Sequence, residues 1–165
     1  MSDLPVFDVE RVFDAPRPMV WRAWTDPDLL QRWYGPGIET VIHAYDLTPG
    51  GAWLNEMKMK TMSDFSKMVF QEIDATSKLI WHHSSSDAEW NIITSPMMPD
   101  WPRVLLTTVT FEDRGDKTSV RLTQVPLDAT DAEIACFAKT MEGMKMGWGG
   151  GYKIIDEILA ELQAG

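Results

Sequence analysis

The chain of 165 residues is long enough for a hydrophobic core of its own, since a domain of this size buries roughly 70% of the surface exposed by the unfolded chain. Its 25 acidic and 15 basic residues give a formal net charge of −10, which repels nucleic-acid phosphates and anionic membrane surfaces. We therefore expect one domain over residues 1–165, no nucleic-acid partner and no membrane insertion.

Cysteine content and the N-terminal residues bear on the compartment. Cys136 is the only cysteine, so no disulfide can form within the chain, which favours a reducing environment. The first residues, MSDLPVFDVERVFD, hold acids where a signal peptide has a basic head and an apolar run. No stretch approaches the roughly 20 apolar residues that span a bilayer. These features predict a cytoplasmic protein.

The N-terminal part predicts one strand followed by two short helices. Residues 6–12 suit a strand, and Asp14 can cap a helix that carries Trp21 and Trp24 on one face. A second helix is predicted after Asp26, because a short acceptor side chain before a proline satisfies free N–H groups of the first turn. This role makes Asp26 a helix cap rather than a catalytic acid. Gly35-Pro36 ends the second helix.

The middle of the chain predicts a sheet. Its hydrophobic period of two and its turn signals indicate about six further antiparallel strands, over residues 38–47, 52–60, 67–75, 78–86, 103–113 and 117–125. The turns are Pro49-Gly50-Gly51, Thr76-Ser77 and Arg114-Gly115-Asp116. Residues 86–101 form an irregular loop rich in tryptophan and methionine, which suggests a lid or a surface for a partner.

The last third predicts a long C-terminal helix. Residues 131–146 are rich in helix formers, and residues 152–162 carry an apolar stripe. Gly147, Gly149, Gly150 and Gly151 interrupt this pattern, and each glycine inside a helix costs roughly 1 kcal/mol relative to alanine. The helix is therefore expected either to kink or break here, or to need a close approach of another backbone.

Several motifs together resemble a known family. The residues that carry the resemblance are Ala15-Pro16, Val20-Trp21, Ala23-Trp24-Thr25-Asp26-Pro27, Leu30, Trp33 with Gly35-Pro36, Pro49-Gly50-Gly51 with Trp53 and Met57, the strand TSVRLTQV, and Gly147-Trp148. The chain resembles the START/Bet v 1-like superfamily (SRPBCC), in the branch named after the activator of the heat-shock protein 90 ATPase. It departs from that family at Ser63-Asp64, where members often carry an Asp-Gly turn.

The resemblance implies an α+β helix-grip fold, in which a curved antiparallel sheet of about six or seven strands surrounds a long C-terminal helix and leaves a cavity. The superfamily includes lipid carriers, hormone receptors and cyclases, so the fold by itself assigns no activity. The chaperone activator carries another domain before the one resembled here. This chain begins its first strand almost at once, so we do not expect chaperone stimulation through the same contacts.

Large aromatic and sulfur-containing side chains are the candidates for a ligand-binding cavity. They are Trp24, Trp33, Tyr34, Trp53, Met57, Met59, Trp81, His83, Trp90, Trp101, Met144, Trp148 and Tyr152. The same side chains can instead fill a closed core, and the sequence leaves both interpretations open. His82 and His83 are adjacent on a predicted strand, so only one of them can face a cavity. The grouping of ligands that a metal needs is missing, and we expect neither a metal nor a cofactor.

Three functions are compatible with these features of the sequence. The first is a non-enzymatic module that binds a small hydrophobic or amphipathic ligand between the sheet and the last helix. The second is a protein-interaction or co-chaperone-like module, and a homodimer could cover the tryptophans of the loop. The third is a cyclase-like or hydrolase-like enzyme with His83 as its acid or base, the weak candidate for a catalytic residue. The residues favour binding over catalysis.

Overall fold

A computed structural model describes residues 4–164 and has the α+β architecture predicted from the sequence. The elements in chain order are β1 (Phe7–Phe13), α1 (Arg17–Thr25), α2 (Pro27–Trp33), β2 (Glu39–Tyr45), β3 (Ala52–Lys58), β4 (Ser63–Asp74), β5 (Lys78–Ser86), β6 (Leu105–Arg114), β7 (Lys117–Pro126) and α3 (Asp131–Ala164). No helix in this part of the chain is long and apolar enough to cross a membrane.

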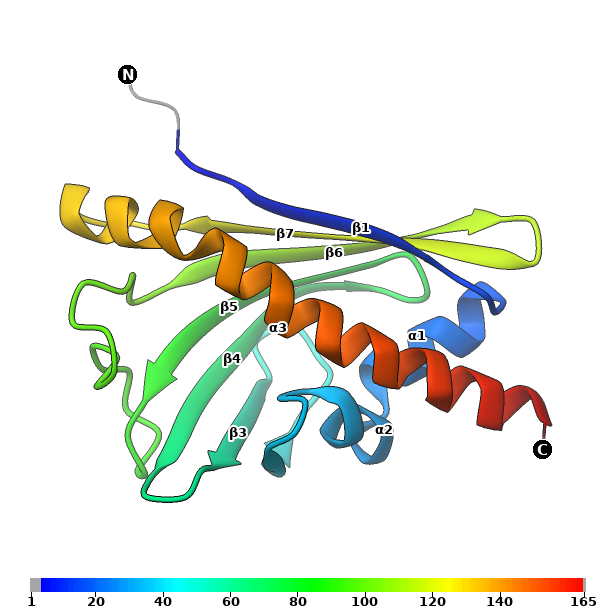
Figure 1. Ribbon diagram of the computed structural model, residues 1–165, viewed down its shortest axis with the longest axis horizontal. Coiled ribbons are helices and arrows are strands. Elements are labelled where there is room, and N and C mark those ends of the chain that lie inside the picture. Colours follow the sequence, from blue (N-terminus) through cyan, green and yellow to red (C-terminus); the bar gives the residue numbers. More distant parts are fainter. Residues whose placement is uncertain (1–3, 165) are drawn as a thin grey trace.

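The seven strands form one antiparallel sheet in the order β1-β7-β6-β5-β4-β3-β2. Helix α3 lies across one face of this sheet, and α1 and α2 pack beside it at one end (Figure 1). The first strand of the chain, β1, pairs with the last, β7, and the two edges of the sheet are β1 and β2. This is the helix-grip arrangement that the family resemblance implies.

Alternation along each strand decides which side chains face α3. Val109 and Leu122 are paired across β6 and β7, and both are fully buried on the helix side. Trp81 and Phe70 are paired in the same way across β5 and β4. Residues two positions apart along a strand point to the same face of the sheet, and paired residues on neighbouring strands share that face. Each buried pair is therefore part of a row of apolar side chains that crosses the sheet. These rows and α3 enclose the core.

The two short helices meet at Asp26. Its side chain accepts a hydrogen bond from the backbone N–H of Asp28 at 3.0 Å, which confirms it as the cap of α2. The prediction that Asp14 caps α1 is wrong: Pro16 holds the cap position, and no side chain bonds to the first turn. Pro18 lies in the first turn, where a helix N–H has no partner in any case, so its missing N–H removes one of the donors that a side-chain cap would satisfy.

Helix α3 runs unbroken through its glycines, so the predicted break is wrong. The alternative prediction, a close approach of another backbone, fits Gly151, and Gly150 lies close to a side chain. A Cβ at Gly151 would lie 2.9 Å from the carbonyl oxygen of Trp33, and one at Gly150 would lie 3.0 Å from Cγ of Pro36. The glycines let α3 rest directly on the end of α2, at a distance that no other residue permits without a shift.

Strand β4 begins at Ser63, four residues earlier than predicted. Ser63 and Asp64 pair with Lys58 and Met57 of β3, so they continue the sheet at the position where family members often carry an Asp-Gly turn. This extension puts Asp64 on the same face as Met68, toward α3.

Candidate functional site

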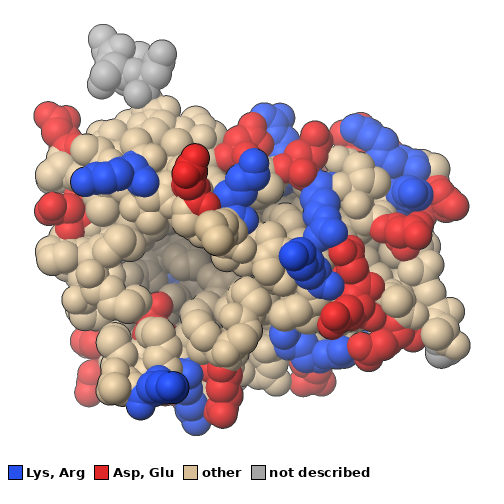
Figure 2. Space-filling view, viewed as in Figure 1, with Lys and Arg blue, Asp and Glu red and all other residues tan. Residues whose placement is uncertain are grey.

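A cavity of about 570 Å³ lies between the sheet and α3. Its wall is formed by Trp33, Tyr34, Gly35, Pro36, Met57, Asp64, His83, Met97, Trp101, Leu105, Gln124, Gly143, Met144, Gly147, Trp148 and Gly151. Figure 2 shows the surface hollowed here, with a rim made mostly of uncharged residues. A space of this size between mainly apolar walls is typical of sites for small molecules.

Seven of the thirteen predicted cavity residues lie in this wall. They are Trp33, Tyr34, Met57, His83, Trp101, Met144 and Trp148. They come from the end of α2, from strands β3 and β5, from the loop after β5 and from α3. The tertiary fold therefore brings together residues that are more than a hundred positions apart.

Four of the other six predicted residues are core. Trp24, Trp53, Trp81 and Tyr152 are each at most 3% exposed and pack against other aromatic rings. Trp24, for example, meets Trp33 with ring centroids 4.7 Å apart. These core residues pack against the side chains that form the cavity wall.

Met59 and Trp90 lie away from the cavity wall. Met59 follows the end of β3, in the connection to β4, where its N–H donates to the carbonyl of Met62. Trp90 packs against Phe65 and His43, each with ring centroids 5.4 Å from its own. Phe65 is adjacent to Asp64 on β4 and so points to the opposite face of the sheet.

Three glycines of α3 keep the helix side of the cavity open. Gly143, Gly147 and Gly151 recur every four residues, so they lie on one face of the helix, and all three line the cavity. A Cβ built at Gly143 or Gly147 would meet no atom within 4 Å. Larger residues at these two positions would project into the empty space.

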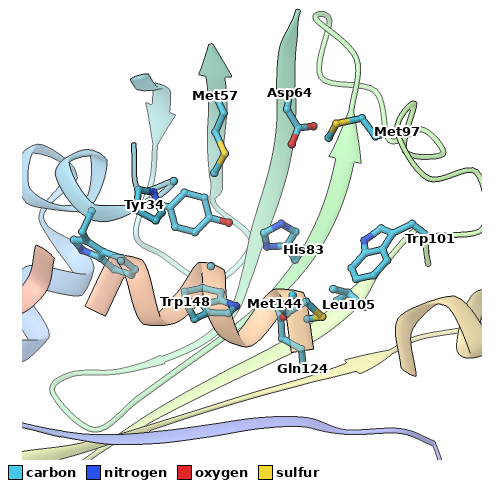
Figure 3. A pocket seen from close by; sticks show the side chains of 16 residues that line it. Tyr34, Met57, Asp64, His83, Met97, Trp101, Leu105, Gln124, Met144 and Trp148 are labelled. Carbon is cyan, nitrogen blue, oxygen red and sulfur yellow. The ribbon is translucent and has the colours of Figure 1, made fainter. Parts of the chain in front are cut away.

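His83 is the central polar group of the cavity. It faces inward with Trp81, whose indole Nε1 lies 3.5 Å from Nδ1 of His83. Burial disfavours the charged ring and lowers the pKa of His83 from 6.5 to about 4. The imidazole is therefore neutral at pH 7 and can either accept or donate a hydrogen bond. Figure 3 shows the Tyr34 hydroxyl pointing toward it.

Asp64 is a wall residue that the sequence analysis missed. Burial raises the pKa of its carboxyl, and the Asp64 charge adds to burial in raising the pKa of the Tyr34 hydroxyl. Its place in the wall is set by the pairing of Ser63 and Asp64 with Lys58 and Met57 of β3, which extends β4 beyond the predicted strand.

Gln124, Leu105 and Met97 are also wall residues outside the predicted set. Gln124 pairs with Thr107 across the sheet, and its Nε2 donates to the Thr107 hydroxyl at 3.0 Å. Met97 and Trp101 belong to the loop between β5 and β6, and Met97 is still 51% exposed. The loop thus contributes to the wall and the rim, as a lid does.

Residues 4–164 contain no group of three His, Cys, Asp or Glu side chains placed to hold a metal ion. Asp64 and His83 are the acid and the imidazole of the wall, and they stand on neighbouring strands at positions that are not paired: His83 is paired with Met68. What the site offers chemically is an apolar space with one carboxyl, one neutral imidazole, one phenol and one amide.

Solved structures with the same fold come from several bacteria. Protein Ms6760 from Mycobacterium smegmatis is 19% identical, with a TM-score of 0.78 and 96% of each chain covered. A protein from Arthrobacter aurescens is 23% identical, with a TM-score of 0.78, covering 94% of this chain and 86% of its own. Protein NE0264 from Nitrosomonas europaea is 21% identical, with a TM-score of 0.74 and both chains fully covered. At these identities the likeness establishes the fold.

The sequence itself matches one family model, described as Activator of Hsp90 ATPase homolog 1-like protein, over residues 14–160. The match begins at the end of β1 and reaches into the last turns of α3. The comparison with curated proteins gives no match.

Proposed function

Because the chain belongs to the family of Activator of Hsp90 ATPase homolog 1-like proteins, we propose that it uses the helix-grip cavity of that fold to bind a small hydrophobic or amphipathic ligand. The observation that carries the proposal is the open, mainly apolar space of about 570 Å³ between the sheet and α3. Apolar ligands of moderate size gain free energy by leaving water for such a space, at roughly 25 cal/mol per Å² of buried apolar surface.

The glycine face of α3 supports this proposal. Folding alone favours filling a void, since each lost contact and each helical glycine is unfavourable. Gly143 and Gly147 nevertheless leave the space open, and Trp148 and Met144 border it with flat and flexible apolar surface. Such a combination suits an exchangeable occupant better than a permanent core.

Filling the cavity from the helix side tests the proposal. Nile red, a neutral dye that fluoresces in apolar surroundings, serves as the probe. We expect the wild-type protein to bind it, with a change in the fluorescence of Trp101 and Trp148, and we expect Gly147→Leu to weaken binding about tenfold or more. The reason is that the leucine side chain takes up the space that the dye needs.

The matched control is Gly149→Leu. Gly149 lies in the same helix and has equally open surroundings, but it borders a groove beside β1 instead of the cavity. Gly149→Leu should bind Nile red as the wild type does. Equal binding by both variants, or no binding by the wild-type protein, would refute the proposal.

A second candidate function is catalysis on a hydrophobic substrate with His83 as a general base. It is favoured by the place of His83 in the wall and by its lowered pKa, which keeps the ring unprotonated at neutral pH. Hydrolysis of a p-nitrophenyl alkanoate tests it. Catalysis would exceed the buffer rate, disappear in His83→Gln and decline as the pH falls toward 4. A rate no higher than that of buffer, or an unchanged rate in His83→Gln, would remove this candidate.

A further inference from the structure

Among residues 4–164, Asp64 is the one acidic residue of the cavity wall, and no lysine or arginine of this part of the chain lines the cavity with it. Figure 3 shows its carboxyl pointing into the space between Met57 and Met97. Both of these neighbours are apolar thioethers, so neither replaces the water that a carboxylate loses on burial.

The polar side chain that precedes Asp64 in the sequence is directed elsewhere. The hydroxyl of Ser63 donates to the carboxylate of Glu56, and His43 contacts the same carboxylate at 2.7 Å. Ser63 and Asp64 are consecutive on a strand, so they face opposite sides of the sheet. The network around Glu56 therefore lies across the sheet from the carboxyl of Asp64.

The other titratable groups that face Asp64 cannot balance its charge. Tyr34, at the end of α2, and His83, on β5, complete the ionisable groups of the wall within the described residues. His83 is neutral at pH 7, and the pKa of Tyr34 is raised by burial and by Asp64 itself. Burial alone sets the direction of the pKa shift of Asp64, with no contribution from a hydrogen bond or a cation.

We propose that the ligand carries a protonated amine on its hydrophobic body, and that Asp64 binds this amine while Trp101, Met144 and Trp148 contact the body. The inference rests on the proposed function, because it names the chemistry of a ligand in the same cavity. An ammonium group supplies the charge and the hydrogen bonds that the protein withholds from Asp64. The net charge of −10 also attracts cations to the molecule and repels fatty acids.

Three eight-carbon probes with different head groups test the inference: octylamine, octanol and octanoate, titrated by calorimetry at pH 7 and 0.15 M salt. We expect octylamine to bind about tenfold more tightly than octanol, because only the amine can form a charge-assisted hydrogen bond with the Asp64 carboxylate. Octanoate should bind most weakly. Asp64→Asn should remove the preference for the amine and leave the affinity for octanol within about twofold of wild type.

A matched variant separates the site from the overall charge. Asp116→Asn removes the same charge from an exposed turn between β6 and β7, and it should keep the preference for octylamine. In the wild-type protein the affinity for octylamine should also increase between pH 4 and pH 7, as the carboxyl ionises, while the affinity for octanol stays constant.

Equal affinity for octylamine and octanol, or an unchanged preference in Asp64→Asn, would overturn the inference and leave the proposed function standing. Failure of all three probes to bind, together with failure of Nile red, would refute the proposed function and the inference with it.

Discussion

The neutral state of His83 links the stability of the protein to pH. Its pKa is lowered from 6.5 to about 4 by burial, so between these values the unfolded chain binds a proton that the native protein excludes. The stability that depends on neutral His83 is complete above pH 6.5 and is lost as the pH falls toward 4. The full loss is at most about 3 kcal/mol.

His83→Gln should remove this part of the pH dependence. We expect its free energy of unfolding, measured by urea titration, to fall less between pH 7 and pH 4.5 than that of the wild-type protein. His82→Gln is the control, because it removes a histidine from the other face of β5 and keeps His83. Identical pH profiles for the wild type and His83→Gln would show that the ring is not desolvated.

The contribution of Asp64 to the pH dependence of stability has the opposite sign to that of His83. Burial raises the pKa of its carboxyl, so the charged form is less favourable in the native protein than in the unfolded chain. Asp64→Asn should therefore raise the melting temperature at pH 7, and the gain should shrink as the pH is lowered to the range where the carboxyl is protonated in both states. A lower melting temperature of Asp64→Asn at pH 7 would contradict this. A wall residue that lowers stability is typical of a functional position.

Residue type alone could not separate wall from core. Trp33 of α2 and Trp24 of α1 pack against each other, yet Trp33 borders the cavity and Trp24 is part of the buried core. Both interpretations, filled core and open cavity, had equal support in the sequence, because large apolar side chains serve either purpose. The difference depends on which rows of the sheet α3 covers and on where its glycines fall.

At the scale of elements, the glycines of α3 divide into two structural roles. Gly151→Ala should destabilise the protein by about 1–3 kcal/mol, because its Cβ would lie 2.9 Å from the Trp33 carbonyl oxygen. Gly147→Ala, in the same helix but with open space around it, should stabilise by up to about 1 kcal/mol.

The two alanine variants are compared by chemical unfolding. Their stability changes should have opposite signs, although helix propensity alone predicts the same sign for both. Stabilisation by Gly151→Ala would show that α3 and α2 are not in close contact.

The elements themselves were largely predictable. The cap at Asp26, the strands with period two and the C-terminal helix follow from local patterns. The start of β4 did not, since Ser63 and Asp64 are weak strand formers whose place is set by pairing with Lys58 and Met57. The continuity of α3 was not predictable either, because Trp33 and Pro36, which meet its glycines, are more than a hundred residues away.

At the scale of the whole molecule, the cavity is bordered by the sheet and by α3. A bound ligand should therefore stabilise both the sheet and the helix. With Nile red bound, we expect slower amide hydrogen exchange in β3, β4 and the middle of α3. The turn between β6 and β7, which contributes no residue to the wall, should exchange at the same rate with and without the dye. Protection spread evenly over the chain, or confined to the loop after β5, would argue against binding between sheet and helix.

The pairing of the first strand with the last has a kinetic consequence. Arg121 of β7 donates to Asp8 of β1, 113 positions away in the sequence, and the whole of β1 depends on such distant partners. During synthesis β1 leaves the ribosome before the other strands of the sheet, and it must wait as an unpaired segment until β7 has been made. Sheets closed by distant contacts fold slowly, on the order of milliseconds to seconds. The sheet is therefore completed last at the edge formed by β1.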